Sequence, residues 1–162
     1  MASFFILTTF SLSLLCACHA DIITDLCPST RNPDFCIKTL EADPAARAAR
    51  DLRAFGQAVV TKCKDLTERV IAAAKPARGP AADECVEASK AAIENLNDCS
   101  RYLKATGRAS SSDLQTAGFE AQENVATCDH QFGSREPAKL KLASREAQDL
   151  IDIIPHIASL LE

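Results

Sequence analysis

Four stretches of this 162-residue chain repeat apolar side chains at intervals of three and four residues. They cover residues 52–74, 82–103, 114–132 and 140–161. That spacing gives a helix one apolar face, and no window shows the alternation that is typical of a strand. Short breaks containing Gly or Pro separate the stretches, and helices joined by short turns pack as antiparallel neighbours. We therefore expect an all-α fold in which residues 52–162 form an up-down-up-down four-helix bundle.

Two local signals refine the bundle helices. Ser112 and Gln115 have the spacing of a capping box and predict that the third helix begins there. Pro155 lies inside the fourth apolar stretch and predicts a kink near the end of that helix.

Residues 21–51 predict several short helices. Asn32-Pro33 and Asp43-Pro44 each combine an N-cap residue with a proline at the first helical position. Helices this short are marginal in water by themselves. Cys27 and Cys36 lie on either side of Asn32-Pro33. A disulfide between them would close a short ring and stabilise the fold by roughly 2.5–3 kcal/mol in the chain-entropy model. We expect this segment to be an N-terminal extension that needs a covalent crosslink.

The first twenty residues have the features of a secretory signal peptide. They carry no charged side chain, an apolar run extends from Phe4 to about Cys18, and Cys18 and Ala20 are the small residues at the cleavage positions. A membrane anchor is the weaker alternative, since the run is short for a span. We expect residues 1–20 to be removed and residues 21–162 to form one secreted domain.

Removal of the leader leaves six cysteines, and an even number in a secreted chain suggests disulfides. If the second and third helices turn near residue 108, Cys85 and Cys128 differ in height by only about 4–5 Å at 1.5 Å per residue. Cys99 and Cys128 would be staggered by about 16 Å, which excludes that pair. Cys63 and Cys99 would be offset by about 9 Å. A third bridge and two buried free thiols therefore remain alternatives for Cys63 and Cys99.

No catalytic or cofactor motif stands out in the mature chain. It has two histidines, His130 and His156, and lacks HExxH, CxxC, a Gly-rich phosphate loop and GxSxG. Carboxylates at helical spacing, such as Glu84 and Glu87, fit a solvated helix face better than a catalytic pair. The net charge of −4 argues against binding to nucleic acid. We expect a protein that is not an enzyme, uses no cofactor or metal, and acts by binding another protein.

The ordered motifs resemble the plant invertase/pectin methylesterase inhibitor family. The match begins with Cys27-x8-Cys36 and Asp43-Pro44, continues at Cys85-Val86-Glu87 with Ala92 and Leu96, and ends with Thr127-Cys128-x3-Phe132. The resemblance covers essentially the whole mature chain. It implies a four-helix bundle preceded by an α-hairpin, with bridges Cys27–Cys36 and Cys85–Cys128. It also implies a noncatalytic inhibitor, of the cell wall or the vacuole, that covers the substrate cleft of a carbohydrate-active enzyme in a 1:1 complex.

Two departures from the family pattern bear on the target. Ser89 replaces the family's Tyr, and the positions of the Pro-Lys-Phe motif of invertase inhibitors are about Ser111-Ser112-Asp113 here. Pectin methylesterase is therefore the expected target, with acid invertase as the alternative within the family and a secreted helical lipid carrier as the alternative from another class. We expect no nucleic-acid or membrane partner, and a monomer or weak self-association. The predicted contact residues are polar ones on the second and third bundle helices: Glu87, Lys90, Glu94, Asp113, Glu120 and Gln122.

Overall fold

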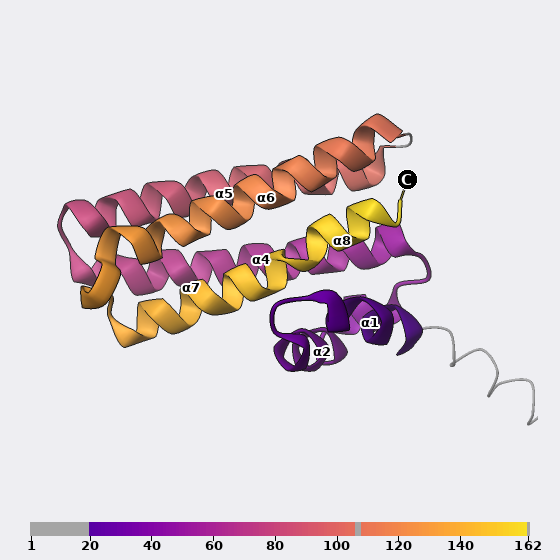
Figure 1. The fold of residues 1–162 in the computed structure, drawn as a ribbon, viewed down its shortest axis with the longest axis horizontal. Coiled ribbons are helices and arrows are strands. Elements are labelled where there is room, and N and C mark those ends of the chain that lie inside the picture. The colour runs from indigo at the N-terminus through magenta and orange to yellow at the C-terminus, as the bar shows by residue number, and fades with distance from the viewer. Residues whose placement is uncertain (1–19, 106–107, 162) are drawn as a thin grey trace, which may run out of the picture.

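The computed structural model describes residues 20–105 and 108–161, and within these ranges all regular elements are helices. The long ones are α4 (Leu52–Ala74), α5 (Pro80–Lys104), α6 (Arg108–Phe132) and α7 (Ala138–Ile151), which the short α8 (Ile153–Ser159) continues. Figure 1 shows them side by side as a helical bundle. The all-α class expected from the apolar periodicity is confirmed for the described chain. No helix in these ranges is long and apolar enough to cross a membrane.

Each long helix contacts the next one along the chain, and the last segment returns to α4. Arg53 at the start of α4 donates hydrogen bonds to the carbonyls of Leu103 and Ala105 at the end of α5, so these two helices run in opposite directions. Near its end, α4 meets α7 through the ion pair between Arg69 and Glu146. The α4–α5 turn contains the 3-10 helix η3 (Lys75–Ala77), and the α6–α7 turn contains η4 (Gly133–Arg135).

The fourth helical segment is interrupted and not merely kinked. α7 ends at Ile151 and α8 begins at Ile153, two residues before Pro155. A proline cannot donate to the carbonyl four residues earlier, and its ring clashes with that carbonyl. For Pro155 that carbonyl belongs to Ile151, the last residue of α7. The predicted position of the distortion is therefore close, but the change is a break between two helices.

The beginning of α6 differs from the predicted capping box at Ser112. α6 starts at Arg108, so Ser112 lies inside the helix, where its carbonyl accepts a hydrogen bond from the Thr116 hydroxyl at 3.0 Å. Ser111 precedes it and is only 2% exposed. Packing of this additional turn against the bundle outweighs the local preference of serine for a cap position.

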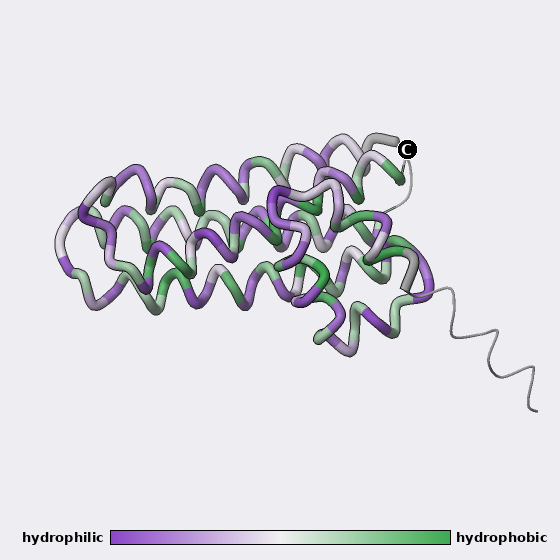
Figure 2. Tube along the Cα trace, turned by 60° about the horizontal axis from the view of Figure 1, so that its bottom comes forward, coloured by the Kyte–Doolittle hydropathy of each residue, from purple (hydrophilic) through white to green (hydrophobic). Residues whose placement is uncertain are grey.

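The apolar stripes of the sequence form the core. Phe55 on α4, Leu96 on α5, Val125 on α6 and Leu150 on α7 are all fully buried. Figure 2 shows the corresponding recurrence of hydrophobic residues along each helix of the bundle. Burying the apolar face of each amphipathic helix against its neighbours is the main source of stability in such a fold.

The N-terminal segment consists of α1 (Ala20–Leu26), the 3-10 helix η2 (Cys27–Ser29), α2 (Pro33–Glu41) and α3 (Pro44–Ala48). The predicted caps are present. The Asn32 side chain accepts a hydrogen bond from the backbone N–H of Phe35. The Asp43 side chain accepts hydrogen bonds from the backbone N–H groups of Ala45 and Ala46. A disulfide joins Cys27 and Cys36, with 5.5 Å between the Cα atoms. The predicted signal peptide lies outside the described residues, apart from Ala20.

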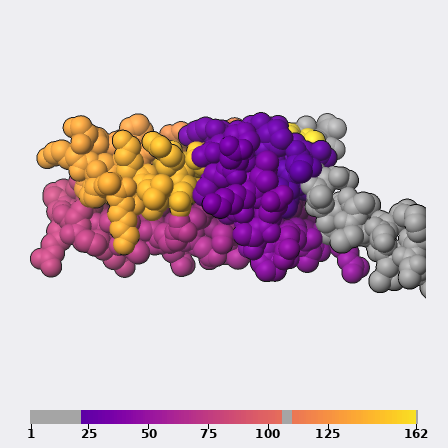
Figure 3. Space-filling view, turned by 90° about the horizontal axis from the view of Figure 1, so that it is seen from below, coloured from indigo at the N-terminus to yellow at the C-terminus, as the bar shows by residue number. Residues whose placement is uncertain are grey.

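The N-terminal segment packs on α4, α7 and α8. In Figure 3 it lies over part of that side of the molecule. Hydrogen bonds attach it to the bundle: the backbone N–H of Arg31 donates to Asp152 at 2.9 Å, and the Asn32 amide donates to Asp149 at 3.0 Å. The outward faces of α5 and α6 therefore lie on the other side of the bundle (Figure 1).

Candidate functional site

The predicted contact residues lie mainly on the outward surface of α5 and α6. Glu87, Lys90 and Glu94 are exposed on α5, and Asp113 and Glu120 are exposed on α6. Glu87 and Lys90 form an ion pair at 2.6 Å, although both side chains are more than half exposed. An exposed pair of this kind contributes little to stability, so both groups remain available to a partner.

Gln122 is placed differently from the other five residues. Two positions along a helix correspond to about 200°, so Gln122 lies on the opposite side of α6 from Glu120. Its amide donates to the Gln148 carbonyl at 3.3 Å and to Asp152 at 3.4 Å. The structure thus brings Glu87, Lys90, Glu94, Asp113 and Glu120 onto one surface and turns Gln122 toward α7 and α8.

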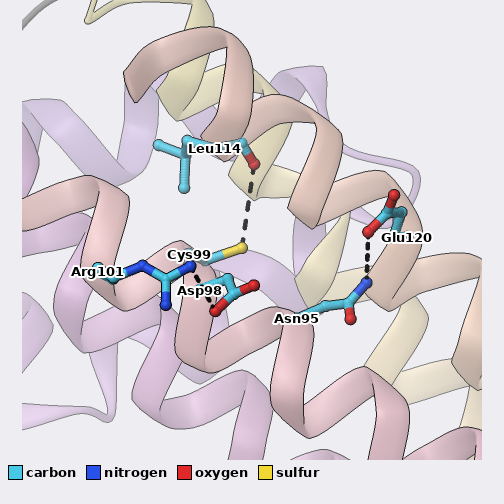
Figure 4. Close-up of polar contacts among 6 residues, drawn as sticks. All are labelled: Asn95, Asp98, Cys99, Arg101, Leu114 and Glu120. Carbon is cyan, nitrogen blue, oxygen red and sulfur yellow. Dashed lines mark hydrogen bonds and ion pairs between the residues drawn. The ribbon is translucent and has the colours of Figure 1, made fainter. Parts of the chain in front are cut away.

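One polar contact at this surface joins α5 to α6, and another lies within α5. The Asn95 amide donates to the Glu120 carboxylate at 2.9 Å, and Arg101 pairs with Asp98 on the same helix at 2.9 Å (Figure 4). Glu120 therefore accepts a hydrogen bond from a neutral amide, which leaves its negative charge uncompensated.

A disulfide fixes α5 to α6 at one end of the seam. Cys85 in the second turn of α5 is bonded to Cys128 in the last turn of α6, and their Cα atoms are 4.5 Å apart. The two helices therefore run in opposite directions. In that arrangement the sequence positions of Cys85 and Cys128 place them at similar heights along the bundle, as expected. Ser89, which replaces the family's tyrosine, is fully buried with its hydroxyl 3.6 Å from the Cys128 sulfur. The serine therefore packs against the bridge, and no aromatic group projects from this position.

Cys63 and Cys99 are free thiols, both fully buried. The sequence left open whether these two cysteines form a third disulfide or remain buried thiols, and in the structure they are buried thiols. Burial is the main cause that raises the pKa of the Cys63 thiol, and burial together with the charge of Asp98 raises the pKa of Cys99 to about 12. The Cys99 sulfur points toward the Leu114 carbonyl at 4.0 Å (Figure 4). Thiols in this state are poor nucleophiles, because the thiolate is the reactive form.

A polar groove near the end of the bundle was not predicted. It has a volume of about 540 Å³ and lies between the N-terminal segment, the end of α6 and α7. On its floor the Asp129 carboxylate accepts from the Ser144 hydroxyl at 2.7 Å and from the Gln148 amide at 2.8 Å. Its lining also contains Glu136 and the cations Arg31, Lys141 and Arg145.

Glu136 is the titratable group that this groove perturbs most clearly. Its burial, the charge of Asp129 and a hydrogen bond to Asp129 raise the pKa of Glu136 to about 7, and the opposing charges of Lys141 and Arg145 do not cancel these effects. Asp129 and Glu136 lie on either side of Gly133 in the sequence, which was a signal that the two carboxylates could approach each other. The sequence alone did not show that Ser144 and Gln148 donate hydrogen bonds to Asp129. The described residues contain no group of three or more His, Cys, Asp or Glu side chains that could hold a metal ion.

Phe119 on α6 is the second feature that sequence reasoning missed. It is 50% exposed and immediately precedes Glu120. The sequence contained a signal for this exposure. Phe119 lies two positions from both Ala117 and Ala121, which belong to the apolar stripe of α6, and two positions correspond to about 200° around a helix.

Comparison with known proteins agrees with this architecture. The family model of the plant invertase/pectin methylesterase inhibitors matches residues 21–156. A pectinesterase inhibitor of Actinidia deliciosa is 29% identical over 150 residues, which are 86% of this chain and 79% of that protein.

Solved structures show the same fold. A mutant form of a pectin methylesterase inhibitor from Arabidopsis superposes with a TM-score of 0.73 at 19% identity, covering 86% of this chain and 97% of that one. A pectin methylesterase inhibitor from Arabidopsis thaliana gives a TM-score of 0.62 at 18% identity, covering 88% and 97% of the two chains. With the family model spanning nearly the whole helical part, the chain belongs to the plant invertase/pectin methylesterase inhibitor family.

Proposed function

We propose that this protein inhibits pectin methylesterase by covering the enzyme's substrate cleft in a noncovalent 1:1 complex. The observation that carries the proposal is the match of the family model to residues 21–156, which is nearly the whole span of the helices, Ala20 to Ser159. Five of the six predicted contact residues, all except Gln122, are exposed on α5 and α6 on the side of the bundle away from the N-terminal segment, and this supports their role in docking. Inhibition by occlusion needs a rigid surface and no catalytic group of its own.

Two observations favour pectin methylesterase over acid invertase. The similar proteins carry the names of pectinesterase and pectin methylesterase inhibitors. In addition, the positions of the invertase motif are occupied by Ser111-Ser112-Asp113, and Ser111 is buried inside α6. This part of α6 therefore lacks the basic and aromatic side chains that such a motif would present to an invertase.

The proposal includes the organisation of the mature protein. Residues 1–20 act as a signal peptide, and residues 21–162 form one inhibitor domain with an N-terminal hairpin (21–51) and an antiparallel up-down-up-down four-helix bundle (52–162). The domain is secreted to the cell wall, with the vacuole as the alternative compartment, and acts as a monomer or with weak self-association. The buried Leu and Ile stripes fill the space between the helices, which disfavours a lipid carrier.

Measurement of enzyme activity tests the proposal. Purified residues 21–162, with disulfides intact, are titrated into a pectin methylesterase at acidic pH, and ester hydrolysis is followed by release of acid. We expect activity to fall linearly until about one inhibitor per enzyme has been added. Acid invertase assayed in parallel is expected to keep its activity. If micromolar protein leaves pectin methylesterase unaffected, the proposal is wrong, and loss of invertase activity alone would establish the alternative.

A further inference from the structure

The polar groove beside the N-terminal segment carries charged groups that the bundle does not use. It lies between the turn before α2, the end of α6 and α7, and its volume of about 540 Å³ is within the range of small-molecule sites, about 300–1,000 Å³. Its lining includes three exposed cations, Arg31, Lys141 and Arg145. The N-terminal segment that borders the groove packs on α4, α7 and α8, so the groove lies apart from the outward surface of α5 and α6 (Figure 1).

The three cations of the groove have no carboxylate partner in the described part of the chain. None of the ion pairs there involves Arg31, Lys141 or Arg145. Arg31 is bonded through its backbone N–H, which donates to Asp152 at 2.9 Å, and within the described residues its guanidinium group makes no hydrogen bond. Cations that line a groove and are not paired within the protein are available to a negatively charged ligand.

Neutral donors, and not these cations, bind the carboxylates on the floor of the groove. Asp129 accepts from the Ser144 hydroxyl and from the Gln148 amide. Asp149 accepts from the Asn32 amide at 3.0 Å. Ser144, Gln148 and Asp149 are each more than nine-tenths buried, so hydrogen bonds hold the floor in a fixed arrangement. Each carboxylate oxygen has two lone pairs, so the floor can still accept hydrogen bonds from hydroxyl groups of a ligand.

The chemistry of the groove fits a ligand that has both carboxylates and hydroxyl groups. Guanidinium and ammonium groups bind carboxylates through charge-assisted hydrogen bonds, and the acidic side chains of the floor accept hydrogen bonds from hydroxyls. Acidic sugars carry both kinds of group on one ring. An inorganic anion such as phosphate would use only the cations and would be repelled by Asp129 and Asp149.

We propose that the groove is a second binding site, which holds a short stretch of a uronic-acid chain with its carboxylates at Arg31, Lys141 and Arg145. The choice of a uronic acid rests on the proposed function. Hydrolysis of a methyl ester in pectin consumes water, releases methanol and leaves a carboxylate on the sugar ring, so de-esterified chains are present wherever the target enzyme has acted. An inhibitor bound to such a chain through the groove keeps its α5 and α6 surface free for the enzyme.

Glu136 makes this binding depend on pH. The charged groups that face it across the groove are Asp129 from α6, Lys141, Arg145 and Asp149 from α7, and Arg31 from the N-terminal segment. The pKa of Glu136 is raised to about 7, so its side chain is neutral at acidic pH. Above that pH it adds a negative charge beside the carboxylates of the ligand. The affinity for an acidic sugar is therefore highest at acidic pH and falls as the pH rises through about 7.

Binding of a defined oligosaccharide tests the proposal. Trigalacturonate is titrated into residues 21–162 by isothermal titration calorimetry at about pH 5.5, where the carboxyl groups of the sugar are ionised. The fully methyl-esterified trimer is the neutral control, and inorganic phosphate is the control for a simple anion. We expect trigalacturonate to bind about tenfold more tightly than either control. Failure of trigalacturonate to bind, or equal binding of the esterified trimer or of phosphate, would overturn the proposal.

Removal of charge inside and outside the groove locates the site. One double variant, Lys141→Gln with Arg145→Gln, removes two cations of the groove. The matched control, Lys104→Gln with Arg47→Gln, removes one exposed lysine and one exposed arginine on α5 and α3. Glutamine, lysine and arginine have similar helix propensities, so both variants are expected to fold, which circular dichroism checks. We expect the groove variant to bind trigalacturonate about tenfold more weakly and the control to stay within about twofold of the unaltered protein. Equal losses would show unspecific attraction to positive charge and would overturn the assignment of the site.

Glu136→Gln tests the dependence on pH. We expect the unaltered protein to bind trigalacturonate about fivefold more weakly at about pH 8.5 than at about pH 5.5, and the variant to bind equally well at both. A variant that keeps the full pH dependence would show that Glu136 does not control the site. None of these measurements contains the enzyme. Loss of sugar binding therefore leaves the inhibitory function intact, and failure to inhibit pectin methylesterase would overturn the proposed function without touching the sugar-binding result.

Discussion

At the scale of single residues, Glu136 links the stability of the protein to pH. Its pKa is raised from an ordinary value of 4.5 to about 7 by burial and by Asp129. Between these two values the folded protein therefore binds this proton more tightly than the unfolded chain does. It follows that the contribution of Glu136 to stability is fully present below about pH 4.5 and is lost as the pH rises through about 7.

Glu136→Gln should remove this pH dependence, because glutamine is neutral at every pH. We expect the variant to be more stable than the unaltered protein near pH 7.5 and to show no advantage near pH 4. Thermal unfolding at the two pH values measures the difference. Glu68→Gln, an exposed carboxylate on α4, is the control for loss of one charge. Parallel pH profiles for the unaltered protein and Glu136→Gln would contradict the role of Glu136.

At the scale of elements, Asn32 couples the start of α2 to the bundle. Its side-chain oxygen accepts from the Phe35 N–H as the N-cap, and its amide nitrogen donates to Asp149, which is 5% exposed. Only an amide side chain of this length supplies both an acceptor for the helix and a donor for the carboxylate. The sequence predicted the first role from Asn32-Pro33, but the second depends on how the N-terminal segment lies against α7.

Asn32→Asp separates the two roles of this side chain. Aspartate keeps the cap but places a second carboxylate beside the buried Asp149, so we expect a loss of about 2 kcal/mol in the free energy of unfolding at neutral pH. Asn32→Ser also keeps a good cap and adds no charge, so its loss should be about 1 kcal/mol. Urea unfolding at neutral and at acidic pH measures both variants. A loss for Asn32→Asp that does not diminish at acidic pH would argue against repulsion by Asp149.

At the scale of the whole molecule, the two disulfides constrain different parts of the chain. Cys27–Cys36 closes a short ring within the N-terminal segment, and Cys85–Cys128 joins residues 43 positions apart on two bundle helices. In the chain-entropy model the first is worth about 2.7 kcal/mol and the second about 4 kcal/mol. The bundle bridge should therefore control global unfolding, whereas the hairpin bridge should act on a local unit.

Pairwise replacement of each bridge by alanine tests this division. Loss of Cys85–Cys128 is expected to lower the melting temperature of the whole protein more than loss of Cys27–Cys36 does. Loss of Cys27–Cys36 is expected instead to make residues 21–51 sensitive to limited proteolysis while the bundle stays intact. Simultaneous cleavage of the hairpin and the bundle in that variant would show that the two parts unfold as one unit.

The sequence by itself determined the helical class, the buried face of each helix and the caps at Asn32 and Asp43. These features depend on spacing and on the chemistry of neighbouring residues, which are local. The tertiary structure alone decided the first turn of α6, where burial of Ser111 outweighs the cap preference of Ser112, and the turning of Gln122 toward α7 and α8. It also decided the contact of Glu136 with Asp129. Each of these depends on which helices become neighbours, and periodicity along one helix carries no information about its partners.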